Sequence, residues 1–280
     1  MDGSKTRGFH GSGRAMRCCR KKALPLQKNI SLANRLISAL PARVRAALLD
    51  KCELVDLRLH SLVGEASRPA EQAYFPVDCF VSVILPSPDT PDVEVALVGQ
   101  EGMFNTATVF GVTTSAFTHL VQGAGRAFRI SVGSLQQLLL EGAGLRQLLH
   151  RYVDVRDQQL ARQLACGRYH SLEQRYARLL LTARDRAQCS ELFMTYEVLA
   201  QMLGVRRETV SRAASFFQDR GLISYNRGYL LLLDEPGLMQ AACLCYQSDQ
   251  LAYEHAIASH GTDKPALVAP VEQGLRRTNA

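Results

Sequence analysis

The sequence predicts an α+β chain in which a domain of short strands is followed by one long helix and a helical domain ending in a hairpin. Three observations predict this order. Short apolar runs separated by Pro and Gly fill residues 52–132, which is typical of a sandwich or barrel. A long helix is expected from about Leu145 to Cys166, with a narrow stripe near the 3.5-residue repeat along it. Residues 195–233 read as helix, glycine turn, helix and hairpin.

The 280 residues suffice for roughly two domains, and their net charge of +7 is unevenly placed. Residues 1–28 hold eight Lys and Arg against one acid, and residues 145–233 hold fourteen Arg against eight acids. Such blocks favour a polyanionic partner, although ordinary surface charge is the alternative. Residues 1–29 are expected to be a disordered basic tail. No apolar run reaches about 18 residues and no secretory signal is evident, so a cytoplasmic protein without a membrane span is expected.

Residues 30–143 are expected to form the strand-rich domain. It opens with a helix over residues 31–50, where apolar residues recur about every four positions. The strands are expected at the short apolar runs, with a turn over residues 86–92, which contain three prolines. Residues 134–141 return to a helix, which Gly142 and Gly144 end.

Residues 144–167 are predicted to form a dimerisation helix. A stripe near the 3.5-residue repeat fits a seam between two helices, and packing of the stripe on its own domain is the alternative. The residues assigned to the dimer helix are Leu145, Leu148, Leu149, Tyr152, Val155 and Gln159.

Residues 168–246 are predicted to form the second domain. A helix over residues 171–186 precedes the two helices of residues 195–220, in which Thr195 is placed to cap the first helix and Gly204 permits the turn. A hairpin around residues 226–228 and a short helix over 236–246 follow. Residues 247–280 are expected to be a polar tail.

The exposed side of the second helix carries Arg207, Glu208 and Arg212. Arginine can donate two parallel hydrogen bonds to guanine, and a carboxylate can accept one from cytosine, so these three are predicted to contact bases. Taken singly, the arginines could be solvated and Glu208 could be an acid favoured by the helix dipole. With the turn and the hairpin, the set predicts recognition of double-stranded DNA. The predicted phosphate contacts are Thr195, Arg206, Ser211 and Arg227.

The eight cysteines and seven histidines show no spacing typical of a zinc site, and no C-x-x-C pair occurs. We therefore expect no metal and no cofactor, and buried or idle thiols; a redox role for some cysteines is the alternative. The chain also lacks the P-loop, G-x-S-x-G, H-E-x-x-H and paired-carboxylate signatures, so it is not expected to be an enzyme.

Residues 30–235 resemble the Crp–Fnr family of bacterial transcription regulators. Three segments carry the resemblance: residues 199–205 (LAQMLGV), 207–212 (RETVSR) and 219–223 (DRGLI). It implies an N-terminal β-roll like a cyclic-nucleotide-binding domain, a long dimerisation helix and a C-terminal winged helix-turn-helix. It further implies a homodimer that reads a palindromic operator through the helix Arg207–Arg220, with RNA polymerase as a further partner. Base contact by Arg207, Glu208 and Arg212 agrees with the family's usage.

The sequence differs from the family pattern in two places. One is the β-roll, and the other is Arg206, where many members have a small polar residue that caps the helix. Cyclic-nucleotide-binding members carry a Gly-Glu pair and then an Arg before Ser/Thr-Ala, whereas this chain has Gly102-Met103 and Thr114-Ser115-Ala116. No Arg or Lys lies between Arg68 and Arg126, so a buried cyclic phosphate would lack a cation and cyclic AMP is not the expected effector. The iron–sulfur branch of the family binds its cluster with spaced N-terminal cysteines. Cys18 and Cys19 are adjacent and do not match that spacing.

The effector is therefore unknown. An apolar cavity is one hypothesis, and an ordinary β-roll core is the alternative. The residues considered for that cavity are Met103, Phe104, Val109, Phe110 and Phe117. The competing function is a protein-interaction module that uses a degenerate β-roll and winged helix without specific DNA binding.

Overall fold

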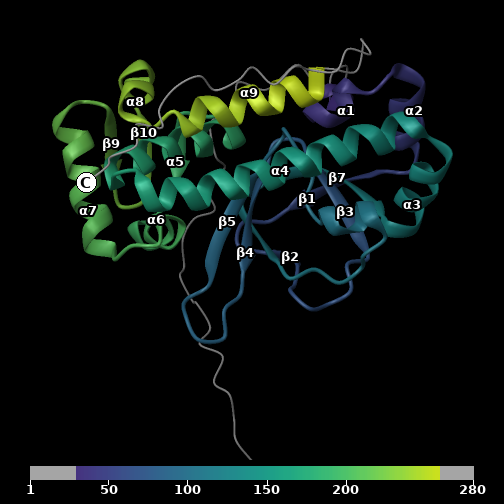
Figure 1. The fold of residues 1–280 in the computed structure, drawn as a ribbon, viewed down its shortest axis with the longest axis horizontal. Coiled ribbons are helices and arrows are strands. Elements are labelled where there is room, and N and C mark those ends of the chain that lie inside the picture. The colour runs from purple at the N-terminus through teal and green to yellow at the C-terminus, as the bar shows by residue number, and fades with distance from the viewer. Residues whose placement is uncertain (1–29, 259–280) are drawn as a thin grey trace, which may run out of the picture.

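The computed structural model describes residues 30–258, so the predicted basic tail (1–29) and residues 259–280 lie outside the described residues. A strand-rich domain and a helical domain lie side by side, and the long helix α4 (Ala143–Tyr169) runs past both of them (Figure 1). Within residues 30–258, no helix has the length and apolar character needed to cross a bilayer.

The strand-rich domain consists of two antiparallel sheets, with strand orders β1-β7-β3 and β2-β6-β4-β5. Their strands are β1 (Glu53–Leu57), β2 (Leu62–Gly64), β3 (Gln72–Pro76), β4 (Phe80–Leu85), β5 (Val93–Val98), β6 (Thr118–Gly123) and β7 (Gly125–Ser131). A small core that includes Val81, Phe104 and Val121 lies inside this domain. The predicted β-roll is confirmed.

Helices cover the outside of the β1-β7-β3 sheet. They are η1 (Ile30–Leu32), α1 (Arg35–Ala39), α2 (Ala42–Asp50), η2 (Thr106–Phe110) and α3 (Val132–Glu141). The helix predicted over residues 31–50 is divided because Pro41 cannot donate a backbone hydrogen bond and starts α2. The second core joins α1 and the sheet residues Phe75 and Ile130 to α4.

The long helix α4 continues past the predicted end at Cys166 as far as Tyr169, so Gly167 lies within the helix. Helix α9 (Cys245–Ala258) packs along α4 in the opposite direction (Figure 1). The prediction of a polar tail from residue 247 is therefore wrong for residues 247–258. Tyr253 and Ile257 of α9 are buried in the core beside α4, although the α9 sequence has little helical amphipathicity.

The second domain is a winged helix with its own core. Its elements are α5 (Leu172–Ala187), β8 (Glu191–Phe193), α6 (Tyr196–Leu203), α7 (Arg207–Asp219), β9 (Ile223–Asn226), β10 (Tyr229–Leu232) and α8 (Glu235–Ala241). Ser171 and Gln174 form a capping box at the start of α5, which separates α5 from α4. Phe80 and Leu97 of the β-roll belong to the core of this domain, so the two domains are packed together.

Candidate nucleic-acid interface

Helix α6 begins and ends where its sequence requires. The Thr195 hydroxyl accepts a hydrogen bond from the Val198 N–H at 3.3 Å, which confirms the predicted cap. At the other end Gly204 has φ +65°, a conformation that favours glycine, and it turns the chain into α7. Residues on either side of this turn, including Leu199 and Val210, are fully buried and fix the angle between the helices.

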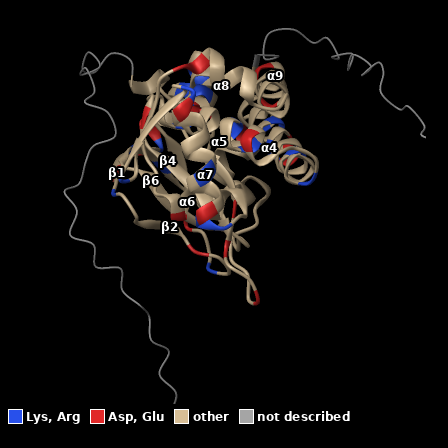
Figure 2. Ribbon diagram, turned by 90° about the vertical axis from the view of Figure 1, so that its left-hand side faces the viewer, with Lys and Arg blue, Asp and Glu red and all other residues tan. Residues whose placement is uncertain are grey.

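Helix α7 has one buried and one exposed face. Val210, Ala213, Ala214 and Phe217 are at most 3% exposed. The predicted base contacts Arg207, Glu208 and Arg212 lie together on the exposed face, where basic and acidic positions are interleaved over α6 and α7 (Figure 2). This separation by face follows from the 3.6-residue period, and it presents polar side chains outward on a firmly packed helix.

Arg207 contacts α6 of its own chain. Its Nε lies 2.6 Å from Glu197 Oε1, and its guanidinium lies 5.8 Å from the centre of the Tyr196 ring. A backbone N–H at the start of α6, together with Arg207, lowers the pKa of Glu197. Both side chains of the ion pair are more than half exposed, so the pair is weak and can open when another acceptor binds Arg207.

The predicted phosphate contacts surround this face. Arg206 occupies the cap position of α7 without a side-chain capping bond and is exposed. Arg227 is exposed in the β9–β10 turn, where its φ is +49°. Thr195 and Ser211 are half-buried. Gly228 follows Arg227 and packs against Phe193, where an added Cβ would lie 2.9 Å from the ring, so the hairpin tip is held in place.

The residues assigned to the dimer helix all lie on α4, but most of them face the β-roll. Leu145, Leu148, Leu149, Tyr152 and Val155 are at most 1% exposed within the chain itself, and Gln159 is half-buried. The first five pack on the β-roll, and the Tyr152 hydroxyl donates a hydrogen bond to the Met103 carbonyl at 3.2 Å. Gly102 makes room for this ring, since an added Cβ would lie 1.9 Å from its hydroxyl. Within the chain, these five residues therefore follow the alternative named from the sequence, packing of the stripe on its own domain.

A cavity of about 250 Å³ lies between the β-roll and α4. Four of the residues considered for an apolar cavity line it, whereas Val109 belongs to the core. The four are Met103, Phe104, Phe110 and Phe117. Sequence reasoning missed two polar residues in the lining, His119 and Arg156, because they come from β6 and α4.

His119 is 3% exposed and stacks on Phe104 with ring centres 5.4 Å apart. Burial, and then the charge of Arg156, lower its pKa to about 4, so the ring is neutral at pH 7. Within residues 30–258, His119 Nδ1 and Asn105 Oδ1 have no hydrogen-bond partner. Unpaired buried polar atoms are costly, and both of these residues belong to the lining of this cavity.

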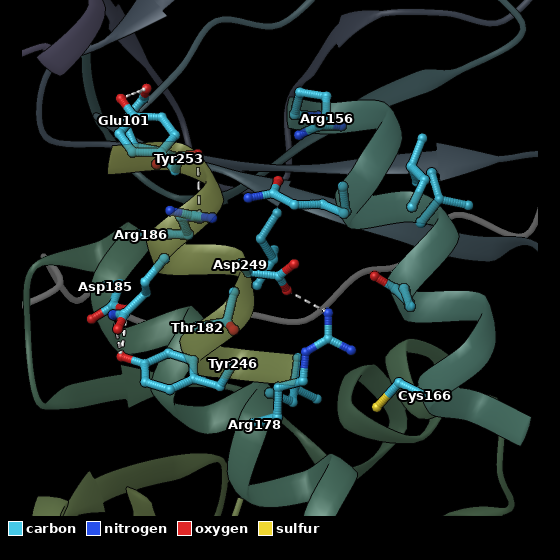
Figure 3. Close-up of a pocket in the computed structure, with 18 of the residues that line it drawn as sticks. Glu101, Arg156, Cys166, Arg178, Thr182, Asp185, Arg186, Tyr246, Asp249 and Tyr253 are labelled. Carbon is cyan, nitrogen blue, oxygen red and sulfur yellow. Dashed lines mark hydrogen bonds and ion pairs between the residues drawn. The ribbon is translucent and has the colours of Figure 1, made fainter. Parts of the chain in front are cut away.

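A second cavity lies at the junction of the two domains, where side chains from α4, α5 and α9 converge (Figure 3). Glu101 is 4% exposed; its carboxylate accepts from the Gly99 N–H and lies 3.2 Å from Arg186 Nε. Its backbone carbonyl accepts a hydrogen bond from the Tyr253 hydroxyl at 2.5 Å. These contacts join the β-roll to α5 and α9 and fix the orientation of the winged helix.

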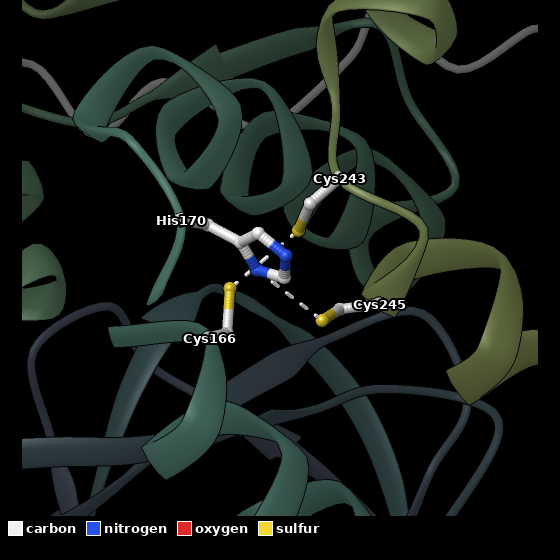
Figure 4. A group of neighbouring side chains, drawn as sticks. All are labelled: Cys166, His170, Cys243 and Cys245. Atoms are coloured by element: carbon white, nitrogen blue, oxygen red, sulfur yellow. Dashed lines mark hydrogen bonds between the residues drawn. The ribbon is translucent and has the colours of Figure 1, made fainter. Parts of the chain in front are cut away.

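A further group was missed by the sequence reasoning, which found no zinc spacing. Cys166, His170, Cys243 and Cys245 come together where α4 ends and α9 begins (Figure 4). No short motif could have revealed this group, because Cys166 and Cys243 are 77 residues apart in the chain.

Comparison with known proteins agrees with this architecture. A family model described as a Crp-like helix-turn-helix domain matches residues 174–241. The chain is 26% identical over 207 residues to a CRP-like cAMP-activated global transcriptional regulator of Mycobacterium tuberculosis, covering 70% of this chain and 91% of that relative.

Solved structures show the same fold. A putative Crp/Fnr-family regulator of Eubacterium rectale aligns with a TM-score of 0.59 at 16% identity, over 76% of this chain and 99% of the other. The c-di-GMP-responsive global regulator CLP of Xanthomonas campestris aligns with a TM-score of 0.58 at 18% identity, over 69% of this chain and all of the other.

Residues 174–241 match a Crp-like helix-turn-helix domain, and the β-roll, long helix and winged helix have the fold of the solved Crp/Fnr-family regulators. The chain is similar to Crp–Fnr-family regulators in its helix-turn-helix domain and in its fold. The relatives found are transcription regulators rather than enzymes.

Proposed function

We propose that the protein is a homodimer that binds a palindromic operator, with α7 of each subunit in the major groove. The observation that carries the proposal is the exposed face of α7. There Arg207, Glu208 and Arg212 stand outward while four residues of the opposite face are buried. In this arrangement the three side chains contact base edges. The phosphates are contacted by Thr195, Arg206, Ser211 and Arg227.

The dimer uses a partly exposed face of α4 that also borders the β-roll cavity. His150, Val153, Asp157, Leu160 and Leu164 follow one another at spacings of three and four, and Leu164 is 75% exposed. This repeat keeps a stripe on one side of a helix and suits pairing with a second copy. Phe110 is 56% exposed and stacks on His150, which extends the apolar surface.

The effector is a molecule other than cyclic AMP. The β-roll cavity presents Met103 and Phe104 where cyclic-nucleotide-binding members carry an acid, and its arginine, Arg156, comes from the dimer helix. A ligand in this cavity would contact α4 beside the proposed seam, so its binding would be coupled to the dimer. We further propose that the regulator works in the cytoplasm and that it acts with RNA polymerase.

The test is selection of bound fragments from a random DNA pool, with and without cell metabolites. A palindrome with two equal half-sites is expected, and its binding should weaken strongly with salt. Arg207→Ala should lose about 1–3 kcal/mol of discrimination at one symmetric base pair, whereas the exposed Arg58→Ala should not. Equal loss by Arg207→Ala on specific and random DNA would contradict base contact. Enrichment of no palindrome would favour the protein-interaction module.

A further inference from the structure

Two short segments bring four metal-binding side chains together at the junction of the domains. Cys166 and His170 lie one turn apart at the end of α4, where the His170 N–H donates to the Cys166 carbonyl. Cys243 lies between α8 and α9, and Cys245, on the other side of Leu244, is the first residue of α9. Figure 4 shows the imidazole and the three sulfurs pointing toward one another. Convergence of four such groups from two segments is what a metal site requires.

The distances fit one tetrahedral ion. The four ligand atoms all lie within 4.8 Å of one another. Cys166 Sγ is 3.5 Å from Cys243 Sγ, and Cys245 Sγ is 3.6 Å from His170 Nδ1. A zinc ion with Zn–S bonds of about 2.3 Å sets its tetrahedral ligand atoms about 3.8 Å apart. A cluster of two or more irons spreads its ligands over separate metal atoms and needs a wider group.

We propose that Cys166, His170, Cys243 and Cys245 bind one zinc ion as a Cys3His site. This donor set is one that structural zinc sites use, and with four protein ligands it leaves no open position for a substrate. Cys166 and Cys243 are buried, whereas Cys245 and His170 are half-buried, so the ion can reach the site from solvent.

The surroundings suit the charge of such a site. Three thiolates and one zinc ion carry a net charge of −1, which a neighbouring cation would stabilise. Arg178 of α5 lies near Cys166, and both line the cavity at the junction of the domains. It is held in place by Asp249 of α9, with the Arg178 Nη2 to Asp249 Oδ2 distance at 2.7 Å, and Asp249 also pairs with Arg162 of α4. These supporting contacts join α4 and α9, which the zinc site also connects, and add α5 to them.

The site has a mechanical role that is separate from DNA recognition. It ties the end of α4, which packs on the β-roll, to the segment that leaves the winged helix at α8. Since the ligands come from both segments, the bound ion fixes the two segments relative to one another. Zinc binding therefore stabilises one orientation of the winged helix against α4.

The test is the metal content of the full chain, purified under reducing conditions and measured by mass spectrometry. About one zinc ion per chain is expected. Cys243→Ser and His170→Ala should lose it, and Cys52→Ser should retain it because Cys52 lies outside the cluster. Circular dichroism of each variant separates loss of the ion from loss of the fold.

Cobalt(II) gives an independent readout on the wild-type chain stripped of metal. A site of this kind should give the absorption of tetrahedral cobalt bound to thiolates, which zinc then abolishes. Absence of both zinc and this absorption in the folded wild type would overturn the proposal. So would an iron–sulfur chromophore, or equal loss of metal in Cys52→Ser. These readouts use no DNA, so failure to select an operator would leave the zinc site standing.

Discussion

Replacing Arg186 by methionine should destabilise the junction between the β-roll and the winged helix. Arg186 Nε lies 3.2 Å from Glu101 Oε1, and the two side chains are only 17% and 6% exposed. Methionine fills similar space but leaves the carboxylate without its cation. Breaking a buried pair in this way costs about 3–5 kcal/mol. The hydrogen bonds from the Gly99 N–H to the same carboxylate remain, so the lower end of this range is expected.

The assay is urea unfolding at pH 7, followed by circular dichroism at one fixed protein concentration. Arg129→Met is the matched control, because Arg129 pairs with Glu53 at the surface, where the side chains are 37% and 66% exposed. That change should cost at most about 1 kcal/mol. Adding Glu101→Gln to Arg186→Met should recover part of the loss, since the unpaired charge is gone. Equal, small losses in Arg186→Met and Arg129→Met would refute the reasoning.

Three further results are expected. Burial raises the pKa of Glu94 to about 8, against the lowering effect of its hydrogen bond from Ser82. The native state then holds a proton that the unfolded state releases near its ordinary pKa of 4.5, so stability should fall as pH rises from about 4.5 to 8. Glu94→Gln should flatten this slope in urea unfolding, and an unchanged slope would contradict it. Leu164→Glu should weaken the proposed dimer at least about tenfold in sedimentation, because each copy loses a buried leucine. The control Leu140→Glu changes an 80% exposed residue of α3, and equal weakening there would refute the seam. Arg227→Ala should weaken binding evenly across DNA sequences and reduce the salt slope by about 1, whereas a loss confined to one base pair would argue against a phosphate contact.

The sequence predicted the β-roll, the long helix and the helix-turn-helix because local signals specify them. Thr195 and Gly204 carry cap and turn chemistry, and residues 226–228 carry hairpin chemistry. Helix α7 has an apolar and a charged face because its residues follow the helical period. Val210 and Phe217 fall on the apolar face, and Glu208 and Arg212 fall on the charged face. Elements whose structure is set by residues close together in the sequence can therefore be predicted from one sequence.

Features that depend on contacts between distant segments could not be predicted. Helix α4 has two stripes that fit a seam, and periodicity does not say which one the β-roll covers. Arg156 enters the β-roll cavity from α4, which follows the last β-roll strand in the sequence. Helix α9 has a weak pattern because its burial comes from a few residues, such as Tyr253, that meet distant partners. The cysteine group joins segments whose separate spacings match no motif.

Helix α9 acts as a strut that is fastened at both ends. Its first turn carries Cys245 of the cysteine–histidine group, and near its last turn the Tyr253 hydroxyl bonds to the Glu101 carbonyl of the β-roll. A rigid rod fixed at two points cannot pivot about one of them without detaching from the other. The winged helix therefore cannot swing freely on the end of α4, and any large reorientation on DNA must release one fastening first.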